Sequence, residues 1–68
     1  MTYKLNKEIE RAAELVRTEC TKEFVRAYEE AGIKGLCEDG RIEYAVDSVR
    51  SLNLQKLLVQ IQSSGNQN

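Results

Sequence analysis

The sequence has no histidine, no proline and no tryptophan, and it has only two cysteines. Without histidine, the usual general base for a serine or cysteine nucleophile is missing, and no Gly-x-Ser-x-Gly motif occurs. Two isolated cysteines cannot complete a tetrahedral zinc site, and they form at most one disulfide. We therefore expect no catalytic residues, no metal and no cofactor, and the sequence predicts a protein that is not an enzyme.

The sequence also lacks an excess of charge of one sign and a long apolar run. Ten basic and eleven acidic residues leave a net charge of −1, whereas nucleic-acid-binding modules of this size normally carry a basic excess. The N-terminus has no long apolar run after a basic start, so it predicts neither a signal peptide nor a membrane span. We expect a cytoplasmic protein with reduced thiols.

The chain of 68 residues has room for one core. A domain this short buries only about 60% of the surface that its unfolded chain exposes, so its monomer is marginally stable. Natural proteins of this size usually add disulfides, a metal or a partner chain. Because the composition argues against the first two, we expect a partner chain, either a second copy in a homo-oligomer or another protein.

The absence of proline, together with the confinement of glycine to two segments, predicts an all-α fold. Apolar residues recur every three or four positions over residues 3–31, which predicts one long helix with one apolar face. Between them, charges alternate in sign at the same spacing and mark a solvated outer face. The apolar positions are Leu5, Ile9, Ala12, Ala13, Val16, Cys20, Phe24, Ala27, Tyr28 and Ala31.

The segment from Gly32 to Arg41 holds three of the four glycines and Cys37. Gly32 predicts a glycine cap that ends the long helix, with Ile33 folding back onto the last turn. Residues 34–38 could form one helical turn that places Leu36 and Cys37 inwards. Asp39 and Gly40 then predict a turn before the next helix. This segment would set how the two halves of the chain fold against each other.

The second half of the chain predicts short helices. Apolar spacing marks a helix over residues 41–52, with Ile42, Ala45, Val46, Val49 and Leu52 on one face, and another over 54–62 after a capping Asn53. Residues 63–68 are polar and uncharged, which predicts a disordered tail. The expected fold is a small bundle of one long helix against two or three short helices, in a single domain of residues 1–62.

Two features of the segment from Gly32 to Arg41 and of the helix predicted after it could react or bind a ligand. Lys34 and Arg41 would favour a thiolate at Cys37, while the acidic residues after it oppose one, so Cys37 is a possible reactive thiol. Cys20 lies on the apolar face and is interpreted as a small core residue. Four carboxylates could bind a divalent cation or a basic partner, although they do not match a calcium loop and more ordinarily form a solvated face. They are Glu38, Asp39, Glu43 and Asp47.

The narrow, alanine-bearing part of the long helix is the predicted contact with a second copy, because small residues let two backbones approach closely. Its residues are Ile9, Ala12, Ala13 and Val16. Three apolar residues fall off the apolar faces of their helices: Leu15, Tyr44 and Val59. Tyr44 lies near Ser48 and Ser51 and is a further interface candidate, because aromatic residues with a polar tip are favoured in interfaces.

The leading hypothesis is a small helical interaction or regulatory module that self-associates as a dimer. A compact helical nucleic-acid-binding regulator is an alternative, since residues 51–54 have helix-turn-helix spacing, but the last helix carries only Lys56 as a cation. A redox or enzyme-accessory protein acting through Cys37 is the other alternative.

Overall fold

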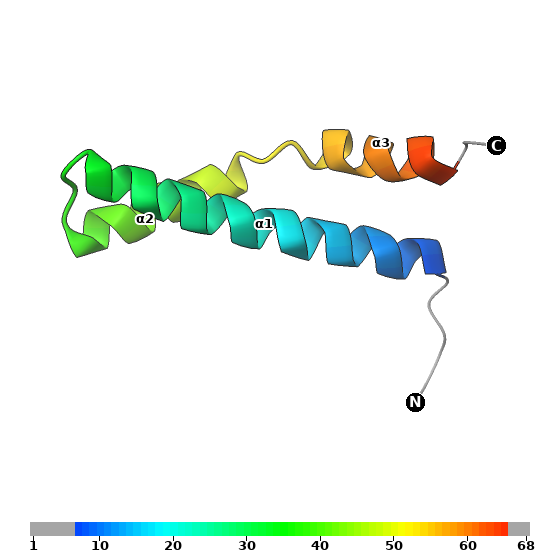
Figure 1. Ribbon diagram of the computed structural model, residues 1–68, viewed down its shortest axis with the longest axis horizontal. Helices are drawn as coiled ribbons and strands as arrows, with labels where there is room; N and C mark the ends of the chain where they lie inside the picture. The colour runs from blue at the N-terminus through cyan, green and yellow to red at the C-terminus, as the bar shows by residue number, and fades with distance from the viewer. Residues whose placement is uncertain (1–6, 66–68) are drawn as a thin grey trace, which may run out of the picture. The chain divides into compact units, whose positions relative to one another are not determined.

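The computed structural model describes residues 7–65, with side chains described as far as residue 60 (Figure 1). Helix α1 spans Lys7–Ile33, α2 spans Glu38–Arg50 and α3 spans Leu54–Gly65, and the described residues form no strand. The prediction of an all-α fold with one long helix packed against shorter helices is confirmed.

The chain divides into two compact units, and α1 contributes to both. The hairpin unit is residues 18–52, which hold the second half of α1 and all of α2; the end unit is residues 1–17 and 53–68. Length explains part of this division. With 27 residues α1 is about 40 Å long, whereas the 13 residues of α2 extend about 20 Å, so α2 can cover only about half of α1.

The predicted end of the long helix is wrong, because α1 continues through Gly32 to Ile33. The residue in the left-handed conformation is Gly35, with φ of 87°. The amide of Leu36 donates to the carbonyl of Ala31 at 3.0 Å, and the amide of Gly35 donates to that of Gly32 at 3.0 Å. These two bonds form the Schellman motif. Ile33, expected to fold back, is instead 87% exposed.

Helix α2 begins earlier than the sequence predicts. Residues 34–37 form a turn and an extended segment in place of a helical turn, and Cys37 precedes the first residue of α2. The amide of Arg41 donates to the carbonyl of Cys37 at 2.8 Å. Asp39 and Gly40 therefore belong to the first turn of α2. There the carboxylates of Glu38 and Asp39 interact favourably with the positive end of the helix dipole.

The start of α3 agrees with the sequence. The amide of Lys56 donates to Oδ1 of Asn53 at 2.9 Å, which confirms Asn53 as the capping residue. Helix α3 then continues to Gly65, three residues beyond the predicted end at residue 62. Residues 66–68 of the predicted disordered tail lie outside the described residues.

The core of the hairpin unit is made of small side chains. Ala27 and Ala31 of α1 and Ala45 of α2 are fully buried, and no large side chain among the described residues is. Alanines at these positions let two helices approach closely. Phe24 and Tyr28, whose ring centroids are 6.3 Å apart, remain half-buried. The hairpin is thus held by close backbone approach and by contacts at its edges.

The end unit lacks even such a core. None of its residues in 7–17 and 53–60 is buried. On these helices' apolar faces Ile9 is 53% exposed, Leu54 is 46% exposed and Leu58 is 42% exposed. The apolar faces of both helices in this unit therefore remain incompletely covered.

Candidate interaction surfaces

A network of charged side chains ties one edge of α2 to α1. Arg26 contacts Glu23 at 2.7 Å and Glu30 at 2.5 Å, both on its own helix. The hydroxyl of Ser48 on α2 donates to the carboxylate of Glu23. The guanidinium of Arg26, followed by the Ser48 hydroxyl, lowers the pKa of Glu23 to about 2. Arg26 also lowers the pKa of Glu30 and has its own pKa raised by these carboxylates.

Tyr44 belongs to the same edge, one turn before Ser48. Lys34 donates to its hydroxyl at 3.2 Å and lies 5.0 Å from its ring centroid, while also contacting Glu30 at 3.5 Å. The Tyr44 hydroxyl, followed by Glu30, raises the pKa of Lys34. Tyr44 is half-buried, so much of its side chain is engaged within the hairpin unit; its role as an interface residue stays a prediction. A shallow, open depression beside it is lined by Tyr44, Asp47, Ser48 and Ser51.

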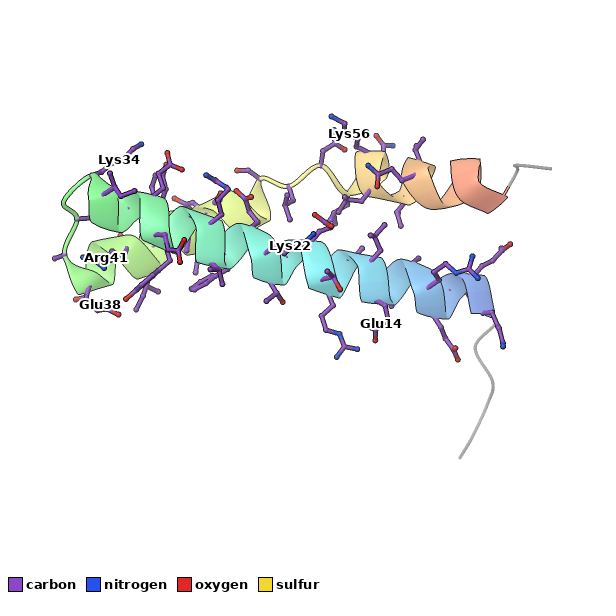
Figure 2. The ribbon with its side chains drawn as sticks, viewed as in Figure 1. Glu14, Lys22, Lys34, Glu38, Arg41 and Lys56 are labelled. Atoms are coloured by element: carbon purple, nitrogen blue, oxygen red, sulfur yellow. The ribbon has the colours of Figure 1, made fainter. Side chains whose placement is uncertain are left out.

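A second set of contacts closes the end of the hairpin where α2 begins. The hydroxyl of Tyr28 donates to Glu38 at 2.7 Å, and this bond raises the Tyr28 pKa because it favours the neutral phenol. Nε of Arg41 donates to the carbonyl of Leu36 at 3.2 Å, and its guanidinium lies 5.6 Å from the Tyr28 ring centroid. Figure 2 shows Glu38 and Arg41 together at this end.

Arg41 also lies close to Gly32, which is inside α1. A Cβ atom at Gly32 would lie 3.0 Å from the guanidinium carbon of Arg41. Glycine therefore leaves the space that Arg41 occupies against α1. The sequence suggests Arg41 as a neighbour of the Cys37 thiol, whereas its observed contacts are with Leu36 and Tyr28.

Both cysteines are free thiols. Cys37 is exposed and Cys20 is half-buried on the apolar face of α1. Cys37 occupies the N-cap position of α2 with φ of −72° and ψ of 174°, and its side chain makes no capping hydrogen bond. The thiol therefore faces solvent and is not buried with Leu36. Its reactivity stays a prediction.

The carboxylates of α2 lie along its exposed side. Asp39, Glu43 and Asp47 are exposed and follow one another at intervals of four residues, which places them one helical turn apart. Within the described part of the chain, no three side chains of the metal-ligating types gather into a group that could hold a metal ion. These carboxylates therefore form a strip along the helix, without converging on one point.

Two apolar residues beside this strip are predicted by the sequence to lie on the buried face of the second helix. Ile42 is 42% exposed and Val46 is 37% exposed. The contact between α1 and α2 runs instead through Ala45, which is fully buried. Apolar periodicity alone could not separate these positions, because all three lie on the same broad arc of α2.

The predicted dimer contact lies in the end unit. Ile9 and Ala13 are exposed, whereas Ala12 and Val16 are half-buried. Leu15, which the sequence places off the apolar face, is also half-buried. The same unit also has exposed apolar side chains on α3, with Leu54 and Leu58 on its apolar face and Val59 off it. Of these, Leu54 and Leu58 follow the periodicity of the last predicted helix, which is the signal that could have added them to the candidate contact.

Comparisons with protein-family models, with curated proteins and with solved structures find no match to this chain. None of the described helices has both the length and the apolar character needed to cross a membrane.

Proposed function

We propose that the protein is a small, non-enzymatic helical interaction module that self-associates through its end unit. The observation that carries this proposal is the lack of any buried residue among the side chains described in the end unit. Two amphipathic helices that leave their apolar faces partly in water gain stability when a further surface covers them.

The size of this gain follows from the exposed side chains. Complete burial of a leucine, isoleucine or valine side chain contributes about 1.5–3 kcal/mol, so each half-exposed one leaves about 1 kcal/mol unrealised. On its apolar faces the end unit presents three such residues in each copy: Ile9, Leu54 and Leu58. In a symmetric dimer every contact is made twice, which doubles the contribution.

A second copy is a suitable partner for this surface. Ala12 and Ala13 keep part of α1 narrow, so another helix can approach it closely. On the outer side of α1, Arg17 contacts Glu14 at 2.6 Å, so these charges are already matched within the helix. The two unpaired cysteines agree with a reducing, cytoplasmic location for such a module.

Sedimentation equilibrium of the wild type and two variants tests this proposal. Ala13→Glu places a carboxylate on the exposed apolar surface of the end unit and should shift the chain from dimer to monomer, weakening association at least about tenfold. Thr18→Glu changes the net charge equally but lies on the opposite side of α1, where it is exposed, and should leave the dimer intact. A wild-type chain that stays monomeric at high micromolar concentration contradicts the proposal.

A further inference from the structure

We propose that the exposed side of α2 binds a basic amphipathic helix of a partner protein. This surface, here called the acidic face, consists of Asp39, Ile42, Glu43, Val46 and Asp47, all of which are exposed. It belongs to the hairpin unit and uses none of the residues proposed for self-association.

Helix geometry places these residues together. Asp39, Glu43 and Asp47 recur every four positions, and Ile42 and Val46 form a parallel row beside them. The opposite edge of α2 is held to α1, because Ser48 donates to Glu23 and Tyr44 accepts from Lys34. The acidic face is therefore presented outwards by contacts on the other side of its own helix.

The charges of the hairpin unit are unbalanced. Residues 18–52 include eight acidic and five basic residues, a net charge of −3. Four of the five cations are engaged: Lys22 with Glu19, Arg26 with Glu23 and Glu30, Lys34 with Glu30, and Arg41 with Leu36 and Tyr28. Arg50, the fifth, is exposed in the last turn of α2, three residues after Asp47, so it borders the acidic face at its C-terminal end. Among the described residues no ion pair involves Asp39, Glu43 or Asp47.

The apolar row and the carboxylates of the acidic face together indicate which kind of partner it would bind. An apolar row beside carboxylates fits a helix whose apolar residues recur every three or four positions and are flanked by lysine or arginine. Nucleic acids and anionic membranes carry the wrong charge for this surface. A second copy of this chain also fits poorly, since residues 7–17 hold three cations and three carboxylates, and Lys56 is the only cation of α3.

Synthetic peptides provide the probe. The test peptide is a 20-residue, end-capped, alanine-based helix with one leucine stripe flanked by lysines. Two matched peptides replace either every lysine by glutamate or every leucine by alanine. Fluorescence anisotropy measures their binding to the full chain, and amide chemical-shift changes locate the contact. The measurement is repeated on Ala13→Glu, so that the result does not depend on whether the end unit self-associates.

We expect the lysine–leucine peptide to bind at least about tenfold more tightly than either matched peptide, and to weaken as salt is raised. Its chemical-shift changes should fall within residues 39–50. Glu43→Lys combined with Asp47→Lys should weaken binding about tenfold or more. Glu10→Lys combined with Glu29→Lys changes the net charge equally at exposed positions elsewhere and should bind like the wild type.

Three outcomes would overturn the inference. These are equal binding of the lysine and glutamate peptides, binding by Glu43→Lys/Asp47→Lys as tight as by the wild type, and shift changes centred outside α2. Because self-association is measured separately by sedimentation, a monomeric wild type that still binds the peptide at α2 would refute the proposed dimer and support the acidic face.

Discussion

Glu23 connects the two helices of the hairpin unit through a single carboxylate, which contacts Arg26 on its own helix and Ser48 on α2. The pair with Arg26 was predictable, because the two residues are three positions apart on one helix. The contact with Ser48 spans 25 residues, and nothing in the local sequence indicates it. The contact between Ser48 and Glu23 depends on the turn between Ile33 and Glu38, because the conformation of this turn sets which residues of α2 face α1.

Replacing Glu23 by glutamine should change how the free energy of unfolding depends on pH. The pKa of Glu23 is lowered from 4.5 to about 2 in the folded chain, so its ionised form stabilises the fold above pH 4.5, and that contribution is lost as the pH falls towards 2. Glu23→Gln should therefore be less stable than the wild type at pH 7, with the difference disappearing by about pH 2.

Thermal unfolding followed by circular dichroism over this pH range provides the measurement. Glu29→Gln removes a carboxylate from an exposed position on the same helix and controls for the change in net charge. A constant difference between wild type and Glu23→Gln from pH 7 to pH 2 would show that the carboxylate contributes nothing through its ionised form.

At the scale of the helices, the ends rather than the helices themselves were difficult to predict. The sequence predicts Asn53 correctly as the capping residue of α3, because its side chain accepts from an amide only three residues away. Two glycines, Gly32 and Gly35, could each have ended α1, and sequence alone favoured the first. Gly32 lies within α1, and the guanidinium of Arg41 on α2 occupies the space beside it, a contact between helices that the local sequence does not indicate. The left-handed residue is Gly35.

Gly35→Ala should destabilise the hairpin by about 1 kcal/mol, because φ of 87° is unfavourable for a residue with a Cβ atom. The space around Gly35 is open, and a Cβ atom at this position would have no neighbouring atom within 4 Å, so the cost comes from the backbone alone. For a domain of this size the melting temperature should fall by about 4–8 °C.

The matched variant is Gly35→Asn, because asparagine tolerates the left-handed conformation better than alanine. It should lose less stability than Gly35→Ala in denaturant unfolding. Equal stability of Gly35→Ala and the wild type would mean that the Schellman motif does not control where α1 ends.

For the whole molecule, composition and periodicity were sufficient to predict an all-α fold with one long helix. They could not predict which apolar side chains are buried in the contacts between helices and which remain exposed. Ala45, rather than the larger Ile42 or Val46, fills the contact between α1 and α2, so large apolar side chains of α2 remain exposed. The first half of α1 is grouped with α3, where no described residue is buried. Coverage of this kind depends on helix length and packing, which periodicity does not determine.

Backbone hydrogen exchange at different protein concentrations tests most directly whether a second copy completes the end unit. Raising the concentration from about 1 μM to about 1 mM should increase the protection of amides in residues 7–17 and 54–60, because dimer formation follows mass action. Protection in residues 38–50 should increase less, since α2 lies outside the proposed contact. Protection in residues 7–17 and 54–60 that stays the same across this range would contradict self-association through the end unit.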